Sequence, residues 1–572
     1  LSWLVCFFCG WRPRVFSPFY SSAGSDVFKI QRLIPVVPFF AINLLMGLMP
    51  ISAWRFYWVS QLGMLAGTAV YVNAGAELGE VISSDGGFSL AGIMTPGLLG
   101  ALVLLAIFPW FARSLMSQLK TKRSLITRAK GRTKPKKFDD NLIVIGGGAA
   151  GLVSSIIGSA VKAKVTLIEK HKMGGDCLNT GCVPSKAIIH AAKIVHENRQ
   201  GHDSGLLCGI PADIDFKQVM KHVHDSIKAI EPHDSIERFE GLGVSCATGQ
   251  AKILSPWEVE IQHSTGETEV RSAANIIIAT GGRPRIPQIP GLDQITYYTS
   301  DTLWQITELP KRLLVLGAGP IGCELGQAFA RLGAHVSIVD KGQFLMPRED
   351  EDVSLLVAEA MVAEGINHIP NRSISQFESS NNGQVAVLDN GEKVEFDALL
   401  LAIVREGNTG NLGLKNVDLI ADSSGFLAVD EYLQTACPTI YACGDVIGGY
   451  QFTHVSAHEA WFASVNSLFG HFKRFKADYR VIPWATFTSP EVARVGISEK
   501  EAKLKNIPYE STQYGLDDLD RAITDNAASG FVRVLTVPGK DKIIGATVVG
   551  PRADDLIAIF VIGMKHGLGL NK

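Results

Sequence analysis

The sequence has almost no net charge and no regular cysteine pattern. Its 572 residues include 54 Lys and Arg against 56 Asp and Glu, a formal net charge of −2, so no overall field attracts it to nucleic acid. Its nine cysteines are odd in number and scattered. This argues against the disulfide framework of a secreted protein and favours a reducing compartment. A chain of this length is expected to hold three or four domains.

Charged residues are scarce in the first 112 positions, which contain three long uncharged stretches. These are residues 33–54, 56–76 and 86–112. The last, as a helix of about 40 Å, could cross a hydrocarbon core of about 30 Å. Prolines and glycines interrupt the first two, which favours broken or re-entrant membrane segments there. Buried helices of a soluble domain are the alternative. Because Leu1 is not Met, the region is also interpreted as truncated.

A basic segment follows these stretches. Residues 113–137 contain ten Lys or Arg and no acidic residue. Such a segment can be a solvated linker or a nucleic-acid tail. Next to a membrane span, it indicates the cytoplasmic side by the positive-inside rule. We therefore expect a multi-pass membrane domain at 1–115, a basic linker at 116–138, and a cytoplasmic remainder.

From residue 138 the sequence alternates short β-branched stretches, glycine turns and helical segments, which is typical of an α/β fold. One strand–loop–helix–strand unit occurs twice, offset by 171 residues. In both copies Gly-x-Gly-x-x-Gly follows a strand, and an acidic residue comes 18 positions after the last glycine. These residues are Gly146, Gly148, Gly151 and Glu169 in the first unit, and Gly317, Gly319, Gly322 and Asp340 in the second.

Each unit has the features of a dinucleotide site. The glycines let the backbone approach a pyrophosphate at a helix N-terminus, where free N–H groups and the helix dipole favour negative charge. The acid can accept hydrogen bonds from a ribose. Two such units predict two dinucleotides and electron transfer between them. The Asp340 carboxylate would repel a 2′-phosphate, which favours NADH over NADPH, although Lys341 lies beside it.

Two cysteines lie between the two units. Cys177 and Cys182 belong to the segment 174–186, which has glycines before and between them. They can close a small disulfide at the start of a helix, whose N-terminus would lower the pKa of a reduced thiol and support thiol exchange. The alternatives are half of a metal site or two incidental buried cysteines. No second Cys or His pair follows at short spacing, so we predict no metal site.

With these motifs, residues 139–572 resemble the class I pyridine nucleotide–disulfide oxidoreductases, which include dihydrolipoamide dehydrogenase, glutathione reductase and mercuric reductase. The resemblance also rests on residues 279–284, 441–446 and 487–493, in the family's order. It implies two Rossmann-like dinucleotide-binding domains and an α+β dimerisation domain in a homodimer. The expected domains are FAD-binding at 139–290 and 406–478, NAD(P)-binding at 291–405, and dimerisation at 479–572.

The resemblance implies roles for single residues. Cys182 matches the flavin-proximal thiol, and Cys177 matches the thiol that attacks the substrate. Lys186 and Glu324 match an ion pair beside the flavin and the nicotinamide, and complete the expected catalytic set. The expected FAD contacts include Glu169 at the adenosine ribose and Asp445 at the ribityl chain, together with Lys186, Gly249, Thr280 and Gly281.

Two features depart from the family pattern. The second Ala-Thr-Gly-Arg turn is Ala402-Ile403-Val404-Arg405 here. Valine tolerates a positive φ poorly, so we expect an altered turn. The chain also ends at Lys572, before the family's catalytic histidine and glutamate, so the dimerisation domain is interpreted as truncated. His566 precedes that position and is interpreted as an ordinary helix residue.

The N-terminal part resembles another family. Residues 32–38 with Asn43, and then residues 67–75, resemble the SNARE-associated (VTT, DedA-type) membrane domain over about residues 25–115. This resemblance implies an all-α membrane domain fused to the reductase.

The leading hypothesis is a membrane-tethered enzyme. It would pass electrons from NAD(P)H through FAD to the Cys177–Cys182 disulfide and on to a small-molecule disulfide. A mercuric reductase, with a metal-ion substrate, is the alternative within the family. The alternative from a different class is a membrane transport or lipid-handling protein with a flavin redox sensor. The intact cysteine pair and both glycine loops favour the enzyme.

Overall fold

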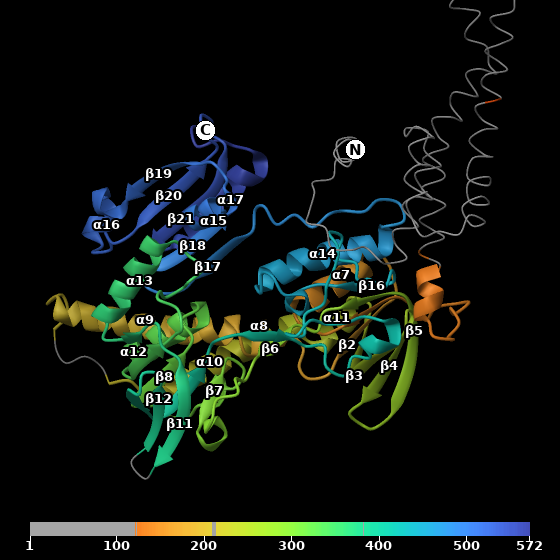
Figure 1. The fold of residues 1–572 in the computed structure, drawn as a ribbon, viewed down its shortest axis with the longest axis horizontal. Helices are drawn as coiled ribbons and strands as arrows, with labels where there is room; N and C mark the ends of the chain where they lie inside the picture. The colour runs from red at the N-terminus through yellow and green to blue at the C-terminus, as the bar shows by residue number, and fades with distance from the viewer. Residues whose placement is uncertain (1–71, 73–120, 122, 209–212, 381–382) are drawn as a thin grey trace, which may run out of the picture. The chain divides into compact units, whose positions relative to one another are not determined.

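The computed structural model describes residues 72, 121, 123–208, 213–380 and 383–572. The chain divides into two compact units, Leu1–Ser124 and Leu125–Lys572, and the second contains nearly all of the described residues (Figure 1). The three uncharged stretches and the segments that resemble the VTT domain lie outside the described residues, except for Val72.

The predicted membrane location is contradicted by the described part of the chain. No helix there is both long enough and apolar enough to cross a bilayer. Helix α9 (Cys182–Asp203) has 22 residues, but charged side chains interrupt it, among them Lys186, Lys193, Glu197 and Arg199. We therefore correct the prediction of a multi-pass membrane protein.

The basic segment contacts its own chain. Arg128 donates a hydrogen bond to the carbonyl of Asp418 (2.8 Å), and Lys130 forms an ion pair with the Asp418 carboxylate (2.9 Å). Arg132 forms another with Glu258 (2.9 Å). Such exposed pairs contribute little stability individually. They nevertheless show that Lys130 and Arg132 pair with carboxylates of the same chain.

A parallel sheet holds the first glycine unit. Its strand order is β3-β2-β1-β5-β16, and β4 joins β3 and β5 as an antiparallel extension. Leu142, Ile143 and Val144 of β1 are fully buried, as expected for a strand covered on both faces. The strands are β1 (Asp140–Ile145), β2 (Val165–Glu169), β3 (Val244–Ser255), β4 (Glu258–His263), β5 (Thr268–Ile278) and β16 (Ile440–Ala442).

Helices α7 (Ala149–Ala160) and α14 (Thr453–Phe469) cover one face of this sheet (Figure 1). Leu142 and Val144 pack towards them, while Ile143 and Ile145 belong to a separate apolar cluster with the segment around Val417. The alternation follows from the two-residue period of a strand.

A second parallel sheet holds the second glycine unit. Its order is β10-β9-β8-β14-β7, and a three-stranded antiparallel sheet, β11-β12-β13, follows β10 in the chain. The strands are β7 (Tyr297–Thr299), β8 (Arg312–Leu316), β9 (His335–Val339), β10 (Asn367–Ile369), β11 (Ile374–Ser380), β12 (Gly383–Leu388), β13 (Lys393–Phe396) and β14 (Ala398–Leu401). Two short strands, β6 (Gly282–Pro284) and β15 (Arg405–Gly407), form an antiparallel ribbon.

Residues 483–550 form an antiparallel sheet near the C-terminal end of the chain, called the third sheet below. Its order is β17-β18-β21-β20-β19, and Val495, Val548 and Ile557 form part of the core beneath helix α17. Its elements are β17 (Pro483–Thr486), β18 (Glu491–Gly496), α15 (Glu499–Lys505), β19 (Glu510–Gly515), α16 (Asp520–Thr524), β20 (Phe531–Thr536), β21 (Ile543–Gly550) and α17 (Ala553–His566).

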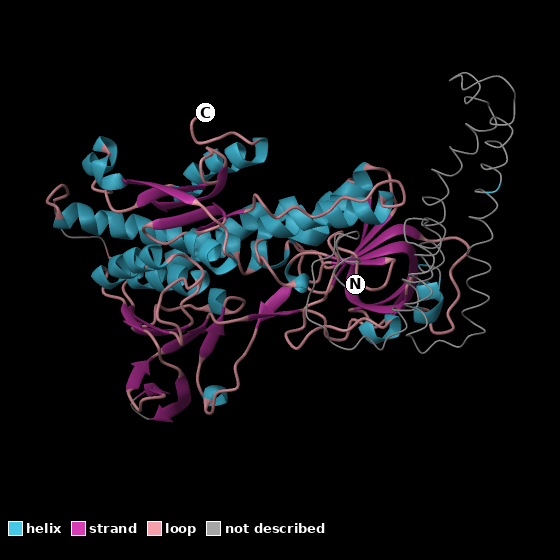
Figure 2. Ribbon diagram, turned by 45° about the horizontal axis from the view of Figure 1, so that its top comes forward, coloured by secondary structure: helices cyan, strands magenta, loops and turns pink. Residues whose placement is uncertain are grey.

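A group of helices lies between the second and third sheets (Figures 1 and 2). One apolar cluster runs from Leu313 of β8, through Phe329 and Ile188 on the helices, to Phe531 and Val549 of the third sheet. Besides α7 and α14, the described part of the chain has the helices α8 (Gly175–Asn179), α9, α10 (Phe216–Ile230), α11 (Ile236–Gly241), α12 (Pro320–Leu332) and α13 (Glu351–Ala363) outside the third sheet. The 3-10 helices are η1 (Glu231–Asp234), η2 (Leu292–Gln294), η3 (Leu303–Gln305), η4 (Leu414–Val417), η5 (Asp445–Ile447) and η6 (Leu516–Asp518).

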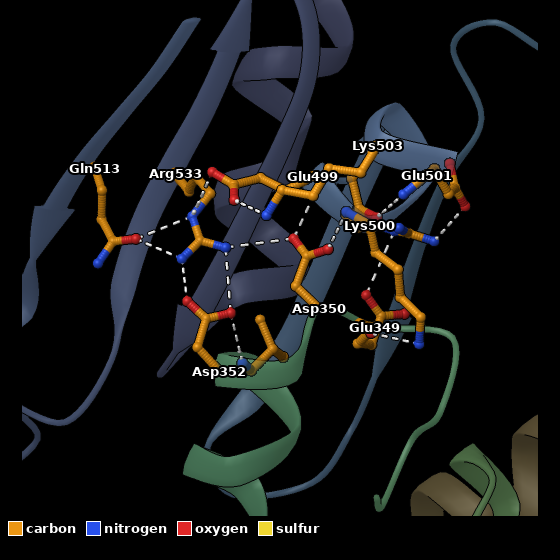
Figure 3. A network of polar contacts seen from close by, with 12 residues as sticks. Glu349, Asp350, Asp352, Glu499, Lys500, Glu501, Lys503, Gln513 and Arg533 are labelled. Atoms are coloured by element: carbon orange, nitrogen blue, oxygen red, sulfur yellow. Dashed lines mark hydrogen bonds and ion pairs between the residues drawn. The ribbon is translucent and has the colours of Figure 1, made fainter. Parts of the chain in front are cut away.

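Charged side chains join the third sheet to the start of helix α13 (Figure 3). Arg533 of β20 contacts Asp350 (3.3 Å) and Asp352, and Gln513 accepts a hydrogen bond from Arg533 Nε (2.9 Å). The Arg533 and Asp350 side chains are both buried. Removal of one member of such a buried pair typically costs about 3–5 kcal/mol, so the network fixes how the third sheet packs against α13.

Candidate active site

The two glycine loops have the same backbone conformation at their first glycine. Gly146 has φ +110° and Gly317 has φ +115°. A Cβ on Gly146 would lie 2.3 Å from the carbonyl oxygen of Ala279, and one on Gly317 would lie 2.4 Å from that of Ala402. Neither position can hold another residue without moving the adjacent strand.

The other two glycines of each loop differ in their surroundings. A Cβ on Gly151 would lie 1.7 Å from the Gly146 carbonyl oxygen, so the helix packs against the loop there. In contrast, a Cβ on Gly148 would meet only Gly175, at 3.7 Å, and one on Gly319 would meet nothing within 4 Å. Each middle glycine therefore opens onto free space at a helix N-terminus.

The N-termini of the helices α7 and α12, beside these loops, have no side chain that would compete with an anion. Neither α7 nor α12 has a side-chain cap or an acidic residue in its first turn. Their first N–H groups can therefore bind an anion. Free space in front of unoccupied N–H groups fits the pyrophosphate of a dinucleotide at both loops.

The predicted ribose acids occupy equivalent places. Glu169 accepts a hydrogen bond from the N–H of Gly147 (2.6 Å), and Asp340 accepts one from Ala318 (2.8 Å). Each acid also accepts a hydrogen bond from the N–H two residues further along the chain (2.7 Å and 2.6 Å). A carboxylate has about four lone-pair sites. Each therefore retains acceptor capacity for ribose hydroxyls.

Three of the predicted FAD contacts lie near β5 and β16. Thr280 follows β5, and its buried hydroxyl has no hydrogen-bond partner among the described residues, so it would be able to bond to a polar group of FAD. Gly281 has φ +70°, and Asp445 begins η5, which follows β16. Burial raises the pKa of Asp445, although the nearby Arg405 opposes the shift.

Gly249 has a structural explanation of its own. It lies in β3 opposite His263, and a Cβ would come within 2.6 Å of the carbonyl oxygen of Gln262. The close approach of β3 and β4 therefore accounts for this glycine without a cofactor contact.

The two cysteines occupy adjoining helices. Cys177 is in α8, and Cys182 is the first residue of α9. Both carry free thiols. The Sγ atom of Cys182 lies 3.2 Å from the hydroxyl of Thr453 at the start of α14. A thiol at the N-terminus of a 22-residue helix is well placed to ionise.

The two thiols differ in acidity. A hydrogen bond from Cys177 lowers the pKa of Cys182 to about 6; the Thr453 hydroxyl and the Lys186 ammonium act in the same direction, against burial. The same hydrogen bond and burial raise the pKa of Cys177. Cys182 is therefore the thiolate of the pair at neutral pH, and Cys177 keeps its proton.

Lys186 and Glu324 form the predicted ion pair. The Lys186 Nζ lies 3.0 Å from the Glu324 carboxylate and 4.3 Å from the ring centre of Phe487. The N–H of Phe487 donates to the other carboxylate oxygen (2.9 Å). Glu324 is buried. One turn after Cys182, α9 thus meets α12 and the β17–β18 connection.

The altered turn at 402–405 keeps ordinary backbone geometry. Val404 is not among the described residues with positive φ, and Arg405 begins β15, which pairs with β6. The Arg405 guanidinium donates to the carboxylate of Asp176, the residue before Cys177. Our sequence reasoning did not identify this contact, because the two residues are 229 positions apart.

Glu459 was also missed. Its carboxylate accepts hydrogen bonds from the N–H of Gly444 (2.7 Å) and the hydroxyl of Tyr479 (2.9 Å). Burial raises its pKa to about 7. It thereby supports the turn that carries Asp445. Its place nearly two turns into helix α14 gave no signal in the sequence.

The comparisons identify the family. Residues 140–460 match the model of the pyridine nucleotide-disulphide oxidoreductases, and residues 482–572 match the dimerisation domain of these enzymes. The chain is 33% identical over 442 residues to the dihydrolipoyl dehydrogenase of Chlamydia pneumoniae. The aligned residues cover 76% of this chain and 92% of the relative.

The chain belongs to the pyridine nucleotide-disulphide oxidoreductases. It is also 32% identical over 434 residues to the mercuric reductase of Bacillus cereus, which covers 75% of this chain and 68% of the relative. The solved structure of LpdA from Mycobacterium tuberculosis matches with a TM-score of 0.69 at 25% identity. It covers 75% of this chain and 94% of the other.

A second solved structure, the HOCl-induced flavoprotein disulfide reductase RclA from Escherichia coli, has a TM-score of 0.67 at 25% identity, covering 75% of this chain and 94% of that one. The protein is thus an NAD(P)H-dependent flavoprotein disulfide reductase that uses FAD. The dimerisation domain supports a homodimer. In the part of the chain that the structure describes, no group of three or more His, Cys, Asp or Glu side chains is placed to hold a metal ion.

Proposed function

We propose that this oxidoreductase transfers electrons from NADH through FAD to the Cys177–Cys182 pair, which then reduces a small disulfide. The observation that carries the proposal is the asymmetric pair itself. A thiolate at a helix N-terminus accepts a hydrogen bond from a second thiol. This arrangement suits thiol–disulfide exchange, which requires one ionised sulfur and a second within bonding reach.

FAD, when bound, supplies a two-electron carrier between the nicotinamide and the cysteine pair. The Lys186 ammonium and the Thr453 hydroxyl stabilise negative charge on Cys182. Glu324 holds Lys186 in place from α12. We assign Cys177, Cys182, Lys186 and Glu324 to the catalytic group on these contacts.

The exchange with substrate balances within the cysteine pair. The reduced pair, one thiol and one thiolate, gives two electrons and one proton to the substrate disulfide, which takes a second proton from solvent and leaves as two thiols, and a bond forms between Cys177 and Cys182. Cys177 is the thiol proposed to attack the substrate. Its proton has to leave before attack, because the thiolate is the nucleophile. The Cys182 thiolate, which accepts a hydrogen bond from Cys177, is the group that takes this proton.

The preference for NADH is supported by Asp340. Both of its carboxylate oxygens accept backbone hydrogen bonds, which hold the carboxylate beside the second glycine loop. A second negative charge on a 2′-phosphate at that position would be repelled. We likewise assign FAD to residues 139–290 and 406–478, the nicotinamide nucleotide to 291–405, and subunit contacts to 479–572.

Reduction of a mercuric ion is a second candidate. Mercuric reductases are among the relatives, and a thiolate next to a thiol is a soft ligand pair suited to such an ion. On this alternative the ion is the substrate, and Cys177 and Cys182 would bind it in their reduced form.

The test is an anaerobic titration of the purified protein with NADH, followed by mass labelling of thiols. We expect bleaching of the flavin absorbance and two new labelled thiols, on the Cys177 and Cys182 peptides. Cys182→Ser should still allow flavin bleaching but form no such pair. Flavin reduction in the wild type without new thiols would contradict the proposed path. NADH oxidation with lipoamide, with glutathione disulfide and with mercuric ion then separates the substrates.

A further inference from the structure

Helix α8, which carries Cys177, has little stability of its own. It has five residues, Gly175–Asn179, whereas an isolated helix needs about 12–15. Gly174 and Gly175 precede and begin it with positive φ values of 86° and 56°. No side chain caps its N-terminus. The position of Cys177 therefore depends on contacts made by distant segments.

Two such contacts hold the ends of this helix. Beyond its C-terminus, the indole N–H of Trp304 donates to the carbonyl of Thr180 (2.8 Å). In its first turn, Nη2 of Arg405 donates to the carboxylate of Asp176. Asp176 directly precedes Cys177, so the second contact acts next to the reactive sulfur.

The Arg405 side chain makes further contacts. Its Nη2 donates to the carbonyl of Gly282 in β6 (3.0 Å), and its Nε lies 3.5 Å from the carboxylate of Asp445. Only 18% of this side chain is exposed. One guanidinium thus joins α8, the β6–β15 ribbon and the turn that carries Asp445.

We propose that Arg405 is a positioning residue that keeps Cys177 within bonding reach of Cys182 by holding Asp176 against the Asp445 turn. The inference rests on the proposed function in that it concerns the same cysteine pair. The rigid fork of arginine donors can serve several acceptors at once, whereas the lysine ammonium is a single point charge. Holding two groups in the reactive geometry raises their effective concentration, which stabilises the disulfide relative to the dithiol.

The experiment measures that equilibrium in purified full-length holoenzyme in dithiothreitol redox buffers, by mass labelling of the Cys177 and Cys182 peptides. The protein disulfide gains two electrons and two protons to become two thiols, while dithiothreitol is oxidised to its cyclic disulfide. Arg405→Met is expected to shift the equilibrium about tenfold towards the dithiol, which corresponds to about 30 mV. Asp176→Asn should shift it in the same direction, and the double variant should add little, because both changes break one contact.

Arg283→Met is the matched control. Arg283 belongs to the same ribbon, but it is 57% exposed and pairs with Glu406 (2.6 Å), so its loss should leave the equilibrium unchanged. Arg405→Lys should lie between the wild type and Arg405→Met. Should Arg405→Met fail to fold, Asp176→Asn tests the same contact from a side chain that is 48% exposed.

Three results would overturn the proposal. These are an unchanged equilibrium in both single variants, fully additive shifts in the double variant, or an equal shift in Arg283→Met. The measurement uses neither NADH nor substrate. A wild-type disulfide that NADH does not reduce would therefore contradict the proposed electron path without affecting the role of Arg405.

Discussion

The two glycine units repeat each other residue by residue across an offset of 171. Leu142 pairs with Val165 in the first sheet, and Leu313 pairs with Val336 in the second. The loop N–H groups that bind Glu169 and Asp340 are likewise equivalent. What the units share matches the part that all dinucleotides have in common, the pyrophosphate and its adjoining ribose.

The units differ outside the loop and the acid. Buried Glu324 of α12 corresponds to Val153 of α7 by the offset of 171 residues. Gly281 and Val404 correspond by position, because each is the third residue after its strand, β5 or β14. The cysteine helices follow only the first unit. A repeated backbone frame therefore carries different side chains at equivalent positions, and we propose that these differences give the two units different roles.

The largest expected effect comes from the middle glycines. Gly148→Ala and Gly319→Ala place a methyl group in open space at allowed φ values of −83° and −74°, so the fold should persist. Each methyl should displace a pyrophosphate, with loss of one or two charge-assisted hydrogen bonds worth about 1.5–3 kcal/mol each. We expect at least about tenfold weaker FAD retention in the first variant, and a similar rise in the KM for NADH in the second. The ratio of flavin to protein absorbance measures FAD retention, and steady-state kinetics give the KM for NADH. Equal loss of FAD in both variants would contradict the assignment of one cofactor to each unit.

Asp340→Asn tests whether the two acids differ in what they select. Loss of one charge should remove the repulsion of a 2′-phosphate, and a change of 1.4 kcal/mol is about tenfold in preference. We expect kcat/KM for NADPH to rise relative to NADH by about that factor. The equivalent Glu169→Gln should weaken FAD retention and leave nucleotide preference unchanged. A change of preference in Glu169→Gln instead would reverse the assignment of the two units.

The ion pair between Lys186 and Glu324 can be tested by the pH dependence of thiol alkylation. Glu324 belongs to the second unit, and the first unit has Val153 at the equivalent position. Lys186 favours the Cys182 thiolate, so Lys186→Met should raise the pKa of Cys182 above its value of about 6. Alkylation by iodoacetamide should slow by about three- to tenfold at pH 6–7 and remain unchanged at pH 9, where the thiolate is complete in both proteins. Lys193→Met, on the same helix and 57% exposed, is the control and should keep the wild-type profile. An unshifted profile in Lys186→Met would remove the lysine from the thiol environment.

The last prediction concerns the two turns, where Val404→Gly is expected to have the smallest effect. Gly281→Ala places a side chain at φ +70° and should cost about 1–2 kcal/mol. Val404→Gly, at a side chain that is 51% exposed, should cost only about 0.5–1 kcal/mol through the added freedom of the unfolded chain. Urea unfolding measures both. A larger loss from Val404→Gly would show that the valine packs against something other than solvent.

Local sequence patterns were reliable wherever chemistry depends on neighbours in the chain. The glycine spacings predicted both loops, because a first glycine with positive φ and a third packed against its carbonyl leave little choice of residue. The spacing of Cys177 and Cys182 predicted a pair at a helix start. The basic segment misled us, because Lys130 and Arg132 pair with carboxylates that are distant in sequence.

The sequence by itself thus determined the two dinucleotide frames and the redox pair, since each depends on backbone conformation and short spacing. Only the tertiary structure decided the surroundings of the sulfurs. Thr453 comes from 271 residues beyond Cys182, and Glu324 from 138 residues beyond Lys186. The contact between Arg405 and Asp176 spans 229 positions. The acidity of a thiol depends on the charges and donors packed around it, and folding alone brings those together.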